Sequence, residues 1–148
     1  MKTAVFYILF ILLFLFNKSL LAQFSTSDQK IVSGFYTFII NTEWKNEKNF
    51  KLFTIGILDK DSSFYKQCVE KYEGIKLKDS PVKIAFYNSI DIIGDCQVLY
   101  VNKKFNKNIE AVVQKITGKN TLLITNTCKN EKVIMINYNN VLKSLTRL

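Results

Sequence analysis

The sequence predicts an α/β fold in which a mostly parallel, open sheet of four to five strands carries helices on its faces. Three observations predict it. Short apolar, strand-like segments recur along the chain, and amphipathic patterns of helical length separate several of them. Residues 55–58 are apolar at every position, as in a strand that is buried on both faces. Such alternation of strands and helices is typical of right-handed β-α-β crossovers.

The first 22 residues predict a secretory signal peptide. Lys2 gives a basic start, residues 4–16 form an uninterrupted apolar run, and a polar break precedes Ala22. The run is shorter than the roughly 20 residues that span a bilayer. We expect cleavage between Ala22 and Gln23, export to the periplasm, and a single domain over residues 23–148. An uncleaved N-terminal anchor is the alternative.

The first crossover is predicted over residues 28–74. Residues 28–44 indicate a helix, with Ser27 or Asp28 as its N-cap, although their β-branched content leaves a strand open. A strand at 50–58 and a helix at 64–73 follow. Asp59 and Asp61 lie between these two elements, and Gly74 is a natural helix stop.

The second half of the chain continues the same alternation. A helix is predicted at 106–117, where four apolar residues share one face and Gly118 ends the pattern. Four more strands are predicted, at residues 82–87, 96–101, 121–125 and 133–138. Numbering the strands in chain order, we expect the sheet order 2-1-3-4 with the fifth strand at the edge. This topology is Rossmann-like, but no nucleotide-binding glycine motif is present and no cofactor is predicted.

The composition excludes several classes of function. The chain has no histidine, which removes the commonest general base and zinc ligand and every Ser-His or Cys-His arrangement. The net charge is +9, but the lysines are spread along the chain among acidic residues. Clustered Arg and Lys with exposed aromatics would indicate nucleic-acid binding, and that pattern is missing. We therefore expect a solvated basic surface and no nucleic-acid partner.

The order of several short strings resembles the YfiR-like family of exported bacterial regulatory domains. Five strings follow one another as in that family: Glu43-Trp44, then residues 55–58 (IGIL), 94–101 (GDCQVLYV), 121–125 (TLLIT) and 134–138 (IMINY). Two features depart from the family pattern. Lys45 follows Trp44 where a proline is usual, and the chain ends ten residues after Tyr138, so the closing strand and helix are shortened.

The resemblance implies a non-catalytic sensor or repressor of the periplasm. Some family members act on a membrane diguanylate cyclase, and others are fused to a membrane histidine kinase. It therefore implies a membrane signalling partner that acts in trans. A small ligand and a second copy of the chain are further candidate partners. Redox-sensitive disulfides in family members imply a redox-responsive regulator as well.

The predicted topology bears on the three cysteines. Cys68, near the end of a returning helix, and Cys96, at the start of a strand, lie at the same edge of the sheet. Cys128 follows a strand end and lies at the opposite edge, nearly 20 Å away at about 3.3 Å per residue. A disulfide needs Cα atoms within about 7 Å. We expect a Cys68–Cys96 disulfide with Cys128 free; two reduced core cysteines are the alternative.

Four side chains are candidates for binding a partner or ligand. Tyr36 and Trp44 are the aromatics of the first helix that we expect to be exposed, although aromatics at helical spacing also build cores. Lys103 and Lys104 follow a strand end, where open α/β sheets bind ligands, and there they could contact an anion. A solvated loop is the alternative for both lysines.

The pair Asp59 and Asp61 has the spacing of a metal or general-acid pair, but helix capping explains it more simply, and no metal site is predicted. The sequence therefore favours a non-catalytic regulator that binds a membrane partner. A solute-binding module without a signalling partner is the second hypothesis. A small hydrolase that runs on carboxylates is the third.

Overall fold

The computed structural model describes residues 26–130 and 136–138. The predicted signal peptide, its cleavage site at Ala22 and Gln23, and the residues after Tyr138 lie outside these residues. Six strands form the sheet: β1 (Phe53–Leu58), β2 (Lys76–Leu77), β3 (Ser80–Tyr87), β4 (Val98–Val101), β5 (Leu122–Asn126) and β6 (Ile136–Tyr138). The helices are α2 (Thr26–Ile40), α3 (Ser63–Tyr72) and α4 (Ile109–Ile116), with 3-10 turns η1 (Glu47–Asn49) and η2 (Lys103–Asn108).

The strand order is β2-β3-β1-β4-β5-β6. The strands β3, β1, β4, β5 and β6 run parallel, and only the two-residue β2 pairs antiparallel, with β3. The predicted mostly parallel α/β sheet and its order are therefore confirmed, and β2 is an addition. Strand β1 lies in the middle of the sheet, with Ile55 opposite Ile84 on one side and Val98 on the other. Its fully apolar end fits burial on both faces.

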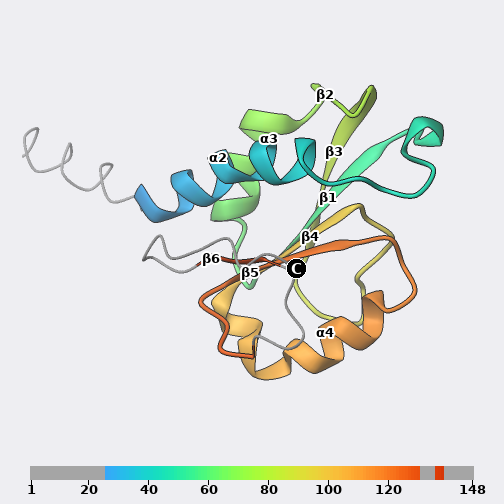
Figure 1. Cartoon of the computed structure of the whole chain (residues 1–148). Helices are drawn as coiled ribbons and strands as arrows, with labels where there is room; N and C mark the ends of the chain where they lie inside the picture. The colour runs from blue at the N-terminus through green and yellow to red at the C-terminus, as the bar shows by residue number, and fades with distance from the viewer. Residues whose placement is uncertain (1–25, 131–135, 139–148) are drawn as a thin grey trace, which may run out of the picture.

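Each face of the sheet has its own hydrophobic cluster. Figure 1 shows α2 and α3 on one side of the sheet and α4 on the other. Ile31 and Phe35 of α2 and Phe64 of α3 pack with Ile55 of β1 in what we call the α2/α3 cluster. The α4 cluster, on the opposite face, contains Ile109, Val112 and Ile116 of α4 together with Leu58, Leu99 and Leu123 of the strands. The period-2 alternation of strand side chains sends neighbouring residues into different clusters.

The first helix differs from its prediction at both ends. Within the described residues it begins at Thr26, so Ser27 and Asp28 lie inside the helix and neither is its N-cap. It ends at Ile40 rather than at residue 44. The Asn41 side-chain amide donates to the Thr37 carbonyl and the Thr42 hydroxyl donates to the Phe38 carbonyl, each at 2.7 Å. These side chains satisfy helix-end carbonyls and end the helix before Trp44.

The two glycine helix stops are confirmed. Gly74 follows α3 and Gly118 follows α4 at the position after the C-cap, and both have φ of 77°. This left-handed conformation ends a helix at little cost only when no Cβ is present. The helix predicted at 106–117 is shorter, because residues 103–108 form the 3-10 turn η2.

Candidate functional site

The carboxyl ends of β1 and β4 meet at the topological switch point of the sheet. The chain leaves β1 toward β3 on one side and later returns to β4 on the other, and open α/β sheets bind ligands in the crevice between two such strands. Asp59 directly follows β1, and Asn102 directly follows β4. Parallel pairing of the two strands therefore brings these polar residues together at one edge.

Asp59 is almost completely buried, at 1% exposure. Its Oδ1 accepts a 2.6 Å hydrogen bond from the Lys60 backbone N–H, and its Oδ2 accepts a 2.8 Å bond from the Asn102 side-chain amide. Both carboxylate oxygens are thus occupied by the protein itself. Of the two aspartates that were predicted to cap the helix, Asp61 does so. Its Oδ1 accepts a 3.2 Å hydrogen bond from the backbone N–H of Ser63, the first residue of α3.

Lys104 closes this edge from the solvent side. Its ammonium lies 2.6 Å from Asp61 Oδ2 and 3.7 Å from Asp59 Oδ1. The hydrogen bond from Lys104 holds the pKa of Asp61 down at about 2, and the Ser63 hydroxyl adds to this effect. Lys103 and Lys104 thus lie at the carboxyl edge where the sequence placed them. The charge of Lys104 is already compensated, which leaves exposed Lys103 as the better anion contact of the two.

Asp28 of α2 adds a third carboxyl group near this edge. Burial raises the pKa of Asp28, and the nearby charges of Asp59 and Asp61 raise it further. Over the part of the chain that the structure describes, no group of three His, Cys, Asp or Glu side chains is arranged to hold a metal ion. The polar cluster at the switch point is therefore a set of internal hydrogen bonds and ion pairs that joins β1, β4 and η2.

The two aromatic candidates behave differently. Tyr36 is 50% exposed on α2, and Ile40, one helical turn later, is 46% exposed. Trp44 is only 4% exposed, so the expectation that it forms part of a binding surface was wrong. Its indole N–H donates to the Gln97 carbonyl at 3.1 Å, and its ring packs edge-on against Phe53 at 5.2 Å between centroids. The helix ends at Ile40, and the chain then turns Trp44 into the core.

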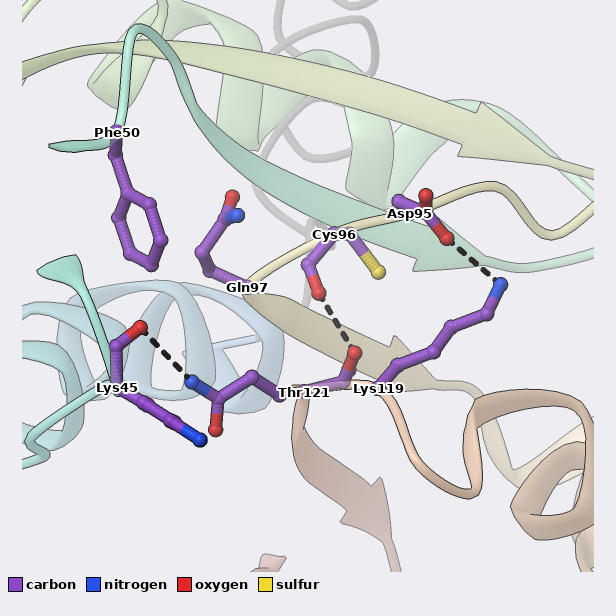
Figure 2. A pocket seen from close by; sticks show the side chains of 8 residues that line it. Lys45, Phe50, Asp95, Cys96, Gln97, Lys119 and Thr121 are labelled. Atoms are coloured by element: carbon purple, nitrogen blue, oxygen red, sulfur yellow. Dashed lines mark hydrogen bonds and ion pairs between the residues drawn. The ribbon is translucent and has the colours of Figure 1, made fainter.

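Sequence reasoning missed a pocket at the amino edge of the sheet, opposite the switch point. It has a volume of about 240 Å³ and lies between the segments that precede β1, β4 and β5 (Figure 2). Its lining residues are Lys45, Phe50, Asp95, Cys96, Gln97, Lys119, Asn120 and Thr121. A second hollow of about 350 Å³ lies between α2 and α3 and is lined mainly by polar side chains, including Gln29, Gln67 and Lys71. No sequence motif marks either one.

The comparison with known families includes the segments that form both edges of this sheet. The model of the YfiR/HmsC-like family matches residues 28–143, which is most of the chain. The chain belongs to the YfiR/HmsC-like family. The resemblance seen in the order of short strings is thereby confirmed. Neither the curated proteins nor the solved structures gave a match. Membership in the YfiR/HmsC-like family is consistent with a regulatory domain.

The disulfide predicted from the topology, between Cys68 and Cys96, is not formed. Cys68 and Cys96 are both unbridged thiols, and all three cysteines are buried. Cys68 of α3 lies in the α2/α3 cluster, whereas Cys96 and Cys128 lie in the α4 cluster, so the sheet separates Cys68 from Cys96. The predicted Cys68–Cys96 bond was wrong because the edge argument compared only positions along the strands and ignored the face that each side chain occupies.

Within residues 26–130 and 136–138, none of the helices combines the length and the apolar content that crossing a membrane requires. The predicted signal peptide is not among these residues.

Proposed function

We propose that the chain is a periplasmic regulator that binds a membrane signalling protein and catalyses no reaction itself. The partner is a diguanylate cyclase or a histidine kinase that acts in trans. Membership in the YfiR/HmsC-like family supports this proposal. An exposed apolar surface on α2 suits binding of the partner. The carboxylates that a catalytic role would need are engaged in contacts within the protein.

The observation that carries the proposal is the exposed apolar pair on α2. Tyr36 and Ile40 are four residues apart, so they lie on the same face of the helix. About half of each side chain is open to solvent. The opposite face of α2 is anchored by Ile31, Phe35 and Ile39, which are fully buried. A rigid helix with an exposed tyrosine and isoleucine suits protein binding, because tyrosine is enriched among residues that dominate interface energies.

The carboxylates at the switch point are committed to structure. A hydrolytic role would need one carboxyl group to exchange a proton with a substrate or a water molecule. Asp59 is buried, with both oxygens hydrogen-bonded, and the Asp61 carboxylate is bound to Lys104. The pKa of Asp61 at about 2 is also far from the range that suits a general acid or base at neutral pH. These contacts favour a binding role over the hydrolase hypothesis.

A second candidate function is small-molecule binding without a signalling partner. The amino-edge pocket of about 240 Å³ favours it, since a pocket lined by charged, amide and aromatic groups can hold a small solute. The sequence-based version of this hypothesis placed the ligand at the carboxyl edge. The pocket lies at the opposite, amino edge of the sheet, so this hypothesis now places the ligand there.

Deleting the gene in its own host tests the regulatory proposal. We expect the deletion to change cellular cyclic di-GMP, if the partner is a cyclase, or phosphorylation of the kinase. The wild-type chain should restore the original level, and the Tyr36→Ala/Ile40→Ala double variant should not. Ile92→Ala is the matched control, because Ile92 is an apolar side chain with 54% exposure outside α2.

Circular dichroism and accumulation in the cell must be equal for the three proteins, so that loss of folding does not imitate loss of binding. A double variant that restores signalling as well as the wild type would remove α2 as the binding surface. A deletion that changes neither output would overturn the proposed function.

A further inference from the structure

The amino-edge pocket is built by three separate segments that hydrogen bonds hold in place. The Asn120 side-chain amide donates to the Lys45 carbonyl at 3.2 Å, and the Thr121 hydroxyl donates to the Cys96 carbonyl at 2.7 Å (Figure 2). The Thr54 backbone N–H donates to Gln97 Oε1 at 2.7 Å. The walls are therefore fixed before any ligand arrives, which lowers the entropic cost of binding.

The lining carries a net positive charge. The charged lining residues are two lysines, Lys45 and Lys119, and one carboxylate, Asp95, so their net charge is +1. Lys119 is paired with Asp95 at 2.8 Å. The ammonium of Lys45 makes no ion pair within the described part of the chain, and it extends along the side of the pocket that also carries Thr121 and Lys119 (Figure 2). One uncompensated cation suits one negative charge on a ligand.

Gln97 supplies a second unused group. Its Oε1 is occupied by the Thr54 N–H, which fixes the orientation of the amide. The NH₂ end of the same amide has no hydrogen-bond partner among the residues described. Gln97 lines the pocket together with Phe50, whose half-buried ring forms the apolar wall (Figure 2). The pocket thus combines a free cation, free amide donors and an aromatic surface.

From these groups we propose that the amino-edge pocket binds a small monocarboxylate that carries a compact apolar group. The carboxylate contacts the Lys45 ammonium, and the apolar group packs on the Phe50 ring beside the Gln97 amide. A volume of about 240 Å³ is below the usual range of roughly 300–1,000 Å³ for drug-sized ligands, so the occupant is small. This site is separate from the α2 surface and does not depend on the proposed regulatory function.

The chain contains its own reporter for this site. Trp44 is the single tryptophan, and its indole N–H donates to the Gln97 carbonyl at 3.1 Å. A residue that lines the pocket is therefore hydrogen-bonded to the fluorophore. Occupancy of the pocket should change the intrinsic fluorescence of Trp44.

The test is a fluorescence titration of the purified protein with three probes that do not absorb at the excitation wavelength of tryptophan. Cyclohexanecarboxylate carries both the charge and the apolar ring. Acetate carries the charge alone, and cyclohexylmethanol carries the ring alone. We expect a saturable change with cyclohexanecarboxylate and at least about tenfold weaker binding of the other two, since each lost contact is worth roughly one factor of ten.

Two lysine variants make the test specific. Lys45→Ala should weaken cyclohexanecarboxylate binding about tenfold, and Lys45→Glu should abolish it, because a charge-assisted hydrogen bond is lost and then replaced by repulsion. Lys48→Ala is the matched control: Lys48 is an exposed lysine three residues away that does not line the pocket. It should bind like the wild type.

Three results would overturn the proposal. The first is no saturable change with the wild type up to about 10 mM cyclohexanecarboxylate, which corresponds to a binding free energy too small for a specific site. The second is equal binding by Lys45→Glu and the wild type. The third is equal binding of acetate, which would remove the apolar wall from the site. Signalling in cells is not measured in this test, so its failure leaves the proposed regulatory function untouched.

Discussion

The side-chain amide of Asn102 donates a 2.8 Å hydrogen bond to Asp59 Oδ2, and this contact joins the carboxyl ends of β4 and β1. The two residues are 43 positions apart in the sequence. Asp59 is buried, so its charge is tolerated only because Asn102, the Lys60 N–H and the Lys104 ammonium surround it. The switch point of this sheet is consequently closed by the protein's own groups.

Replacing Asp59 should therefore destabilise the fold more than replacing Asp61. Asp59→Ala empties a buried site and leaves two partly buried donors without an acceptor, and we expect it to lower the free energy of unfolding by about 1–3 kcal/mol. Asp61→Ala removes a largely exposed ion pair and should cost less than about 1 kcal/mol. Urea denaturation followed by circular dichroism measures both. Equal costs for the two variants would show that Asp59 is not the structural member of the pair.

Gly56 in β1 is required by close packing, not by a positive φ. A Cβ at this position would lie 2.7 Å from Tyr87 Cε2, 3.1 Å from Leu99 Cδ1 and 3.2 Å from Cys96 Sγ. We expect Gly56→Ala to lower the free energy of unfolding by about 1–3 kcal/mol, the usual cost of overpacking a core. Gly94→Ala is the control, since its Cβ would meet only the Tyr87 hydroxyl, at 3.3 Å. A thermal shift no larger for Gly56→Ala than for Gly94→Ala would contradict this prediction.

The burial of Trp44 separates it from Tyr36 in a stability measurement. Trp44→Ala should cost about 3–5 kcal/mol, enough to unfold a marginal domain, because it empties a core site and leaves the Gln97 carbonyl one donor short. Tyr36→Ala should change the free energy of unfolding by less than about 0.5 kcal/mol, as expected for an exposed side chain. Chemical denaturation of both variants checks this. A Trp44→Ala protein as stable as the wild type would contradict the burial of Trp44 in the core.

Export remains a prediction from the sequence. If Ala22 and Gln23 flank the cleavage site, N-terminal sequencing of the protein from cells should begin at Gln23. The physical basis is a basic start followed by an apolar run too short to span a bilayer. A mature protein that still begins at Met1 would favour the uncleaved anchor.

The sequence predicts the sheet well because strand patterns are local. The apolar run at 55–58 and the recurring strand segments locate the parallel strands, and right-handed crossovers between them predict their order and the carboxyl-edge position of Lys103 and Lys104. Contacts between distant segments have no such local signal. The ion pair of Lys104 with Asp61 spans 43 residues, and nothing in either string marks it. The amino-edge pocket is missed for the same reason, since its walls come from three loops.

The wrong prediction that Trp44 is exposed has a different cause. The pattern of apolar residues continues past Ile40, but the side chains of Asn41 and Thr42 bind helix-end carbonyls and stop the helix. Capping by side-chain hydrogen bonds changes the direction of the chain, and this direction decides whether a large aromatic residue faces the core or the solvent. Periodicity alone cannot detect this.

The last prediction concerns Cys68 and Cys96. Burial raises the pKa of each thiol from an ordinary 9.0 to about 12. The folded state therefore holds these protons more tightly than the unfolded chain, so the stability that they contribute is complete below pH 9 and is lost as the pH rises toward 12. The thiolate is the reactive form, so both thiols should resist alkylation in the folded protein at pH 8.

Alkylation with iodoacetamide, followed by mass mapping of a non-reduced digest, checks this. We expect Cys68 and Cys96 to be unlabelled in native buffer, to be labelled in about 6 M guanidinium chloride, and to carry no bridge in either case. The unfolded sample is the internal control, because it shows that both thiols are chemically intact. Recovery of a Cys68–Cys96 peptide pair would mean that the sheet does not separate them, and rapid native labelling of Cys68 would place it outside the α2/α3 cluster.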